Sequence, residues 1–258
     1  MLAVIPIQKS RMNNNAPRRL RRAEAVLLKR TSRLVLVSES CVDTHNLAAM
    51  LRTAELLGIQ HVYVIAQDDD ISSQHKSTVS SGAHSWIEVH EFSTTRECVA
   101  ELRDKNYEIW ATDLDAGAIA ATPGTMPAIP SKLAVVMGRE TDGISDEMRD
   151  LADRLIYLPM HGFTESFNLG VATGMILQRV IDADQSIIGA MPDNERNALR
   201  RHWYAQLGGL GWEEIYAEWL ENPPPPLEDV RPTEESRSPR MKKNLAKRLN
   251  IKTKRDAT

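Results

Sequence analysis

The sequence of 258 residues has only two cysteines, Cys41 and Cys98, and no apolar run long enough to form a membrane helix. Two cysteines are too few for a disulfide framework or a cysteine-based zinc cluster, so we interpret them as ordinary reduced thiols. A membrane helix needs about 18 or more consecutive apolar residues. The N-terminus also lacks the apolar core and small-residue cleavage site of a secretory signal, so we expect a cytoplasmic protein that does not enter a membrane.

The usual nucleotide-binding motifs are also missing. No G-x-G-x-x-G follows a predicted strand, which argues against a dinucleotide-binding domain and a nicotinamide-dependent dehydrogenase. Gly138 and Gly143 have the spacing of P-loop glycines, but Ile144 and Ser145 follow and the phosphate-binding lysine is absent. We therefore expect no ATP or GTP hydrolysis. No spacing typical of metal ligands is found, and we expect no metal.

The net charge is only −3, but basic and acidic residues are unevenly distributed along the sequence. Residues 1–33 hold nine Lys and Arg and one acid, and residues 231–258 hold ten Lys and Arg and three acids. Residues 34–230 carry 13 basic and 31 acidic residues. Basic arms suit a polyanion, because each phosphate that they neutralise releases counterions. Basic tails that merely aid solubility are also common, so charge alone leaves both interpretations open.

Short apolar segments alternate with segments of helical periodicity through the middle of the chain. This alternation predicts an α/β fold, with a largely parallel sheet and helices on both faces. Strands are predicted at residues 34–37, 61–66, 86–89, 107–112, 132–137 and 155–158. Helices are predicted at residues 18–30, 47–57, 95–105, 168–180, 193–206 and 212–221, with a short one after Ser145.

The same pass along the chain predicts four parts. A basic N-terminal extension with one helix spans residues 1–32, and the α/β domain spans residues 33–185. A C-terminal helical extension spans residues 186–222. Four consecutive prolines then open a basic tail at residues 223–258, which we expect to be disordered, as we do residues 1–15.

Three polar or glycine-containing clusters follow predicted strands. They are residues 46–52, which enter the first long helix, residues 138–145 and residues 158–170. Ligands of parallel α/β sheets bind beyond the carboxyl ends of the strands, and glycine there lets the backbone approach a ligand. The clusters are therefore candidates for one shared site.

Each polar residue in these clusters also has a purely structural interpretation. Asn46 and Asn168 are suited to cap helices, Arg52 to an exposed helix face, and Glu140 to a loop in which it bonds backbone. One such coincidence would carry little weight. Three clusters in this order favour a functional site.

The clusters resemble the three motifs of the SPOUT superfamily of RNA methyltransferases. Asn46-Leu-Ala-Ala-Met-Leu-Arg52 is similar to motif 1, Val136 to Ser145 to motif 2, and Leu158 to Asn168 to motif 3. Ser81-Gly82-Ala-His-Ser-Trp86 resembles the Gly/Ala–Trp segment between motifs 1 and 2. The likeness covers residues 33–185. The chain most resembles the TrmH family, because only a basic helix precedes motif 1 and helices follow motif 3.

The resemblance implies a SPOUT fold with a C-terminal trefoil knot, a homodimer, and S-adenosylmethionine as cofactor. The sequence departs from the family at Phe167, usually Leu, and at Leu169-Gly170, usually Val-Ser. Many implied cofactor contacts come from backbone atoms, which survive such changes. These contacts are implied for Thr112, Gly138, Leu158, Met160, Phe167 and Asn168.

The resemblance gives Arg52 the central catalytic role, with Asn46, Glu140 and Asn168 around it. Methyl transfer to a ribose hydroxyl requires alignment of the reacting atoms and stabilisation of the developing alkoxide. A guanidinium stays protonated to a pKa above about 12, so we expect Arg52 to clamp the phosphate beside the target ribose rather than accept a proton. We expect Asn46 and Asn168 to orient Arg52 and the ribose. Glu140 would hold Arg52 or a backbone amide of motif 3.

The sequence thus predicts an S-adenosylmethionine-dependent enzyme that methylates a ribose 2′-hydroxyl of RNA. The resemblance narrows this to a tRNA (guanosine(18)-2′-O)-methyltransferase acting on the D-loop. Methylation of another tRNA site or of ribosomal RNA is the main alternative. A catalytically inactive RNA-binding protein with the same fold is a further one, against which the intact polar residues of the three motifs argue.

Overall fold

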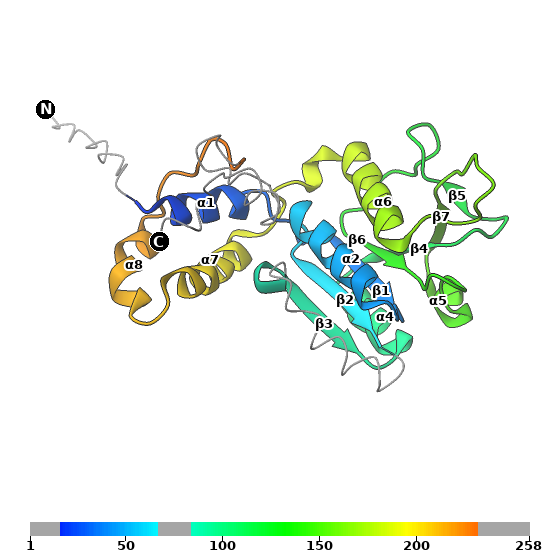
Figure 1. Cartoon of the computed structure of the whole chain (residues 1–258), viewed down its shortest axis with the longest axis horizontal. Helices are drawn as coiled ribbons and strands as arrows, with labels where there is room; N and C mark the ends of the chain where they lie inside the picture. Colours follow the sequence, from blue (N-terminus) through cyan, green and yellow to red (C-terminus); the bar gives the residue numbers. More distant parts are fainter. Residues whose placement is uncertain (1–15, 67–83, 232–258) are drawn as a thin grey trace, which may run out of the picture. The chain divides into compact units, whose positions relative to one another are not determined.

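The computed structural model describes residues 16–66 and 84–231 (Figure 1). Several predicted features lie outside these residues: the N-terminal segment 1–15, the loop at residues 68–73, Ser81 and Gly82 of the Gly/Ala–Trp segment, and the basic tail 232–258. The chain divides into two compact units. The larger unit is formed by residues 26–223, and the described part of the smaller unit comprises residues 16–25 and 224–231.

A parallel sheet of seven strands forms the centre of the larger unit, in the order β3-β2-β1-β6-β4-β7-β5. Every pair of neighbouring strands runs parallel, as the sequence predicted. The two adjacent strands β1 and β6 are buried along their whole length. The strands are β1 (Leu34–Glu39), β2 (His61–Ile65), β3 (Glu88–Phe92), β4 (Glu108–Thr112), β5 (Ile119–Ala120), β6 (Leu133–Met137) and β7 (Arg154–Tyr157).

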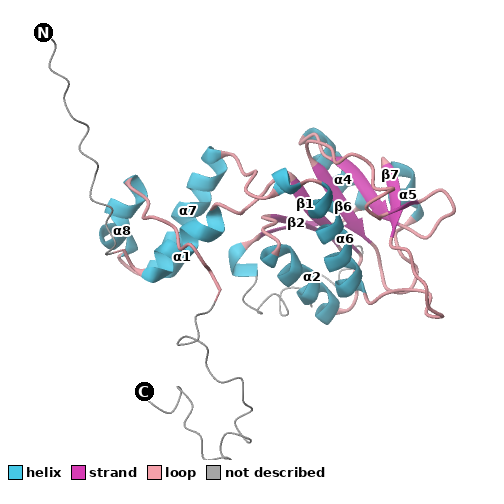
Figure 2. Ribbon diagram, turned by 90° about the horizontal axis from the view of Figure 1, so that it is seen from above, coloured by secondary structure: helices cyan, strands magenta, loops and turns pink. Residues whose placement is uncertain are grey.

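Helices cover both faces of this sheet (Figure 2). Helices α2 (Thr44–Leu56) and α6 (Leu169–Ala183) pack on one face, and α4 (Thr95–Asp104) and α5 (Asp146–Leu151) pack on the other. Successive strand residues point to opposite faces, so Leu34 and Leu36 join the first core cluster while Val35 and Val37 join the second. Two buried faces explain why the strands read as continuous apolar runs.

The predicted C-terminal helices are present as α7 (Asp193–Gly208) and α8 (Trp212–Glu221). Tyr204 of α7 packs edge-to-face on Tyr216 of α8, with ring centroids 5.9 Å apart. Trp203 packs in the same manner on Trp86, which lies in the short 3-10 helix η1 (His84–Trp86). The guanidinium of Arg30 also lies over the Trp203 ring, 5.1 Å from its centroid. The contacts of Trp203 with Trp86 and Arg30 attach α7 to the sheet domain. A second 3-10 helix, η2 (Gln185–Ile187), precedes α7.

Two elements begin two or three residues away from their predicted starts. The strand expected at residues 86–89 lies at 88–92, because Trp86 belongs to η1 and packs on α7 while the later residues pair with β2. The helix expected at 47–57 begins at Thr44, because the Asp43 side chain accepts a hydrogen bond from the backbone of His45 and caps it. Asn46 is therefore inside the first turn and is not a cap. The two-residue strand β5 was not predicted.

The basic helix α1 (Arg18–Leu27) ends three residues earlier than the predicted helix 18–30. Arg30 lies beyond it, fully buried, and donates hydrogen bonds to the backbone carbonyls of Glu55 and Ile59. Within the smaller unit, the Leu227 amide donates to the Arg21 carbonyl, and Arg21 Nε donates to the Pro225 carbonyl. The first residues of the predicted tail are therefore held beside α1.

The trefoil knot and the domain boundaries at residues 32, 185 and 222 stay predictions. None of the helices in the described ranges is long and apolar enough to span a membrane.

The contact between α2 and α6 depends on a glycine. A Cβ atom built on Gly170 would lie 2.9 Å from the Cβ of Ala49, closer than real Cβ atoms approach. A Cβ on Gly174, one turn later, would lie an ordinary 3.6 Å from Cγ2 of Thr53. Gly170 is one of the positions where the sequence departs from the family that it resembles.

We expect Gly170→Ala and Gly174→Ala to have opposite effects on stability. In an open helical position, Gly→Ala stabilises by about 0.5–1 kcal/mol, and we expect this gain for Gly174→Ala. At Gly170 overpacking lowers stability by about 1–3 kcal/mol, which outweighs the gain from replacing glycine. Urea unfolding monitored by circular dichroism would compare the two midpoints. Equal stabilisation by both substitutions would contradict the packing argument.

Candidate active site

The three polar clusters meet at the carboxyl edge of the sheet through one chain of hydrogen bonds. Asn168 caps α6, and its Oδ1 accepts from the amides of Gly170 and Val171. Its Nδ2 therefore points away and donates to Oδ1 of Asn46 at 2.9 Å. Asn46 in turn donates from Nδ2 to Oε1 of Glu140 at 2.5 Å. Because an ionised carboxylate only accepts, these bonds fix the orientation of both amides.

Cys41 is a member of this group that the sequence did not reveal. Its Sγ lies 3.7 Å from Oε1 of Glu140 and 3.4 Å from the carbonyl oxygen of Asp43. Burial, followed by the charge of Glu140, raises the pKa of Cys41 to about 12, so the thiol keeps its proton and donates. The sequence signal was its place just after β1, at the same edge as the three clusters.

A buried carboxylate holds the second cluster in place. Glu39, at the end of β1, is 1% exposed and accepts hydrogen bonds from the amide and hydroxyl of Ser145 at 2.9 and 2.7 Å. It also accepts from the hydroxyl of Thr95, at 2.7 Å. Ser145 caps α5 through a bond from the Met148 amide, as predicted. Glu39 thus ties β1 to the starts of α4 and α5.

The loop between β6 and α5 closes so tightly that its first residue must be glycine. The amide of Arg139 donates to the carbonyl of Gly143 at 2.8 Å. A Cβ on Gly138 would lie 2.2–2.3 Å from backbone atoms of Gly143 and Ile144, so any other residue at this position would clash with the loop backbone. Gly143 itself has a φ of +73°, a conformation that favours glycine. The closed loop presents Glu140 toward Asn46.

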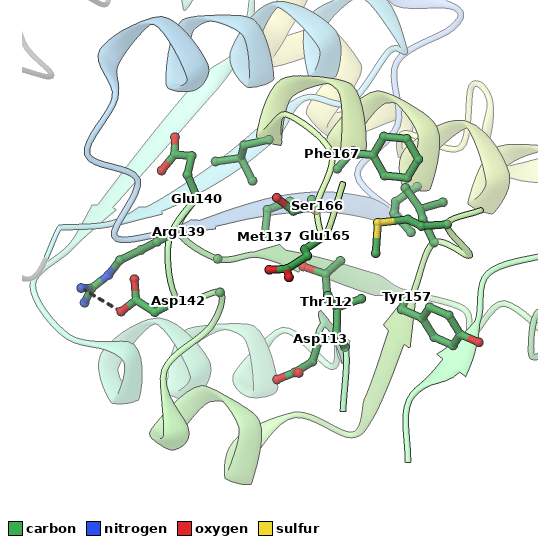
Figure 3. Close-up of a pocket in the computed structure, with 18 of the residues that line it drawn as sticks. Thr112, Asp113, Met137, Arg139, Glu140, Asp142, Tyr157, Glu165, Ser166 and Phe167 are labelled. Atoms are coloured by element: carbon green, nitrogen blue, oxygen red, sulfur yellow. Dashed lines mark hydrogen bonds and ion pairs between the residues drawn. The ribbon is translucent and has the colours of Figure 1, made fainter. Parts of the chain in front are cut away.

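Beside this loop lies a cavity of about 380 Å³, formed by the ends of β4, β6 and β7 and the start of α6 (Figure 3). Its volume falls within the roughly 300–1,000 Å³ typical of small-molecule sites. Neither Asn168 nor Asn46 is among the lining residues, and Glu140 is the member of the hydrogen-bonded chain that lines the cavity. The residues predicted to bind cofactor that do line the cavity are Thr112, Gly138, Leu158, Met160 and Phe167.

Acidic side chains outnumber basic ones around the cavity. Asp113 and Glu165 line it together with Glu140, and the sequence had singled out neither of the first two. Asp113 accepts from Nε and Nη2 of Arg149, at 2.9 and 2.8 Å. Glu165 and Thr112 both line the cavity, as do Arg139 and Asp142, which form an ion pair (Figure 3). Both acids lie in loops after strands, where only the fold shows which side chains share a cavity.

Arg52 stands apart from the hydrogen-bonded group. It lies six residues beyond Asn46 on α2, a rise of about 9 Å, with its side chain exposed. It does not line the cavity, and no described residue forms a hydrogen bond or ion pair with its side chain. The structure therefore brings Asn46, Glu140 and Asn168 together, and Glu140 holds Asn46. The predicted role of Arg52 stays a prediction.

Comparison with known proteins agrees with this arrangement. The SpoU rRNA Methylase family matches residues 33–178. The sequence is 30% identical over 188 residues to the tRNA (guanosine(18)-2′-O)-methyltransferase of Borreliella burgdorferi, covering 72% of this chain and 84% of that protein. It is 34% identical over 145 residues to the 23S rRNA (guanosine-2′-O-)-methyltransferase RlmB of Neisseria meningitidis, covering 56% of each.

The fold is also found among solved structures. The TrmH/SpoU tRNA modifying enzyme of A. aeolicus superposes with a TM-score of 0.58 at 24% identity, covering 72% of this chain and 94% of that chain. The family match spans more than half of the sequence and contains all three polar clusters in full. The chain therefore belongs to the SpoU family of S-adenosylmethionine-dependent RNA 2′-O-methyltransferases.

Proposed function

We propose that this protein methylates the 2′-hydroxyl of guanosine 18 in the D-loop of tRNA. The observation that carries the proposal is the Asn168–Asn46–Glu140 hydrogen-bond chain beside a cavity of small-molecule size. The choice of tRNA rests on the similar proteins. Those named tRNA (guanosine(18)-2′-O)-methyltransferase match over 72% and 62% of this chain in B. burgdorferi and Aquifex aeolicus. The rRNA-specific relative matches over 56%, which makes ribosomal RNA the second candidate.

The cavity has features that suit S-adenosylmethionine, which supplies an electrophilic methyl group on a positively charged sulfur. Gly138 lines the cavity without a side chain, and Leu158 and Phe167 give an apolar wall for a purine ring. Asp113 is paired with Arg149, so the carboxylate of Glu165 is the one that favours a cationic ligand. We therefore assign the donor to this cavity.

The polar residues would then prepare the ribose hydroxyl for attack. That hydroxyl is a weak acid, so the charge that develops on its oxygen must be stabilised. Arg52 is permanently charged and exposed, and we assign it to the phosphate next to the target ribose, which it can clamp with two hydrogen bonds. Asn46 is locked between Glu140 and Asn168, which leaves one N–H and one lone pair of its amide to position the ribose.

Other parts of the chain fit an RNA substrate. Apart from Arg30 and Arg33, which are bonded within the fold, the basic residues in segments 1–33 and 231–258 would bind the phosphate backbone of tRNA outside the active site. We place the enzyme in the cytoplasm, where tRNA is available and where its two buried cysteines remain reduced.

We further propose that the enzyme is a homodimer that pairs through α2 and α6. Along α6, Val171 is 52% exposed and Met175, one turn later, is 36% exposed. Leu56 on the adjacent α2 is 72% exposed. Exposed apolar residues on two packed helices favour contact with another protein surface. A second copy of the chain would cover the exposed apolar residues of α2 and of α6 together.

The proposed reaction predicts methylation of one nucleotide. Purified protein with radiolabelled S-adenosylmethionine should label a tRNA transcript that carries guanosine 18, and mass spectrometry should locate the methyl group on that ribose. The same transcript already 2′-O-methylated at guanosine 18 should remain unlabelled. Labelling of a 23S rRNA fragment instead of tRNA would favour the second candidate and overturn the first.

We expect Arg52→Ala to abolish transfer without affecting the donor site. Loss of a charged group that stabilises the transition state costs about 10²–10³ in kcat. Because Arg52 does not line the cavity, the Kd of S-adenosylhomocysteine measured by calorimetry should stay within about twofold. Arg103→Ala, which removes an exposed arginine of α4, is the matched control and should keep full activity. Wild-type turnover by Arg52→Ala would exclude the proposed role.

The homodimer predicts that a charge in the α6 face separates the subunits. Met175→Glu would bury a carboxylate in an apolar interface, so sedimentation velocity should show a monomer where the wild type shows a dimer. Leu210→Glu is the control, because Leu210 is fully exposed in the turn between α7 and α8. A monomeric wild-type protein, or a dimer in Met175→Glu, would contradict this interface.

A further inference from the structure

We propose that His61, Glu88 and His90 form a zinc-binding site, with Glu195 as the residue that orients His61. The site lies on strands β2 and β3, and α7 supplies Glu195. It is separate from the methyl-transfer site, and the sequence spacing had indicated no metal. The proposal does not rest on the proposed function.

The register of the sheet places the three donors on one face. His61 pairs with Glu88, and Tyr63 pairs with His90, between the parallel strands β2 and β3. Paired residues of neighbouring strands point to the same side, as do residues two apart on one strand. His61, Glu88 and His90 therefore project from the same side of the sheet edge.

The distances between the donor atoms fit a small tetrahedral ion. Nδ1 of His61 lies 3.1 Å from Nε2 of His90 and 3.5 Å from Oε2 of Glu88. All three donor atoms lie within 4.8 Å of one another. In a tetrahedral zinc site with bonds of about 2.0–2.1 Å, donor atoms are roughly 3.3–3.4 Å apart. The two measured distances lie on either side of this value.

Glu195 fixes the His61 ring in the form that binds metal. Its Oε1 lies 2.8 Å from Nε2 of His61. An ionised carboxylate can only accept a hydrogen bond, so Nε2 of His61 is the donor in this contact. Nε2 of His61 therefore carries the proton, and the lone pair of Nδ1 faces the other two donors. A carboxylate behind a ligating histidine is the usual outer partner in zinc sites.

The surrounding charges favour a cation. The Lys105 ammonium is engaged by Glu101 at 2.8 Å. Two neutral imidazoles and one carboxylate, with water in the fourth position, form a donor set that zinc prefers.

The place of the site indicates a structural role. His61 and Glu88 begin their strands, so they lie at the amino edge of the sheet, opposite the edge that carries the cavity. β3 is the edge strand and pairs only with β2 among the described strands. A metal would fasten β3 to β2, and through Glu195 it would stiffen the attachment of α7. Glu88 is 53% exposed, which leaves a path for the ion.

The test uses the full-length protein without a polyhistidine tag, stripped with a chelator and then dialysed. Calorimetric titration with ZnCl₂ should show one equivalent bound per chain with a Kd of about 1 μM or tighter. Co²⁺ in its place should give the intense visible bands of tetrahedral coordination. At a hundredfold excess over Kd, Zn²⁺ should raise the melting temperature by about 5 °C.

Variants separate this site from other histidines. His90→Gln removes one ligand and should weaken Zn²⁺ binding by at least about 100-fold, and Glu195→Gln, which leaves every ligand in place, by about 10–100-fold. Glu88→Gln changes an exposed side chain, so it tests the site without disturbing the fold. His202→Gln, an exposed histidine on α7, should bind like the wild type.

Either of two results would overturn the proposal. One is the absence of saturable Zn²⁺ binding by the wild-type protein. The other is wild-type affinity in both His90→Gln and Glu88→Gln. In these cases the 3.1 Å contact is a hydrogen bond from Nε2–H of His90 to Nδ1 of His61. Methyl transfer is not measured, so the result is independent of the enzymatic proposal.

Discussion

The side-chain amide of Asn46 joins the three segments that form the candidate active site. It accepts from Asn168, the cap of α6, and donates to Glu140, in the loop after β6. An amide has one oxygen and one nitrogen, so a partner on one side determines which atom faces the other. Asn168 is oriented by the helix it caps, and that orientation passes through Asn46 to Glu140. Helix capping, a backbone requirement, thereby sets the geometry of the candidate site.

The hydrogen bond from Asn46 to Glu140 requires that the loop carrying Glu140 is fixed in place, and Glu39 fixes it. Glu39 receives three hydrogen bonds at the end of β1, and a buried carboxylate left without them would carry a large desolvation cost. Ser145, one of its donors, ends the loop, and Gly138 begins it against the backbone of Gly143. With both ends fixed, the loop needs little further ordering when a ligand binds, which favours affinity and alignment.

How far the sequence could predict these features depended on how local their causes are. The parallel sheet, the cap at Asn168 and most of the cavity wall follow from periodicity, capping chemistry and motif likeness along short stretches. Asn46 was expected as a possible cap, but Asp43 takes that role three residues earlier. The cluster of His61, Glu88 and His90 depends on strand register across 27 residues, which spacing cannot reveal. Asp113 and Glu165 meet only when two separate loops fold around one cavity.

Gly170, where the sequence departs from the family, lies at the contact between α2 and α6. Ala49 follows Asn46 by one turn of α2, and Gly170 follows Asn168 by two residues at the start of α6. The contact at Ala49 and Gly170 therefore sets how near the two helices come beside the Asn46–Asn168 hydrogen bond. A hydrogen bond weakens steeply as its atoms separate, so a side chain at residue 170 would act on the site without touching substrate. Helix packing and catalytic geometry are thus one constraint at this point of the fold.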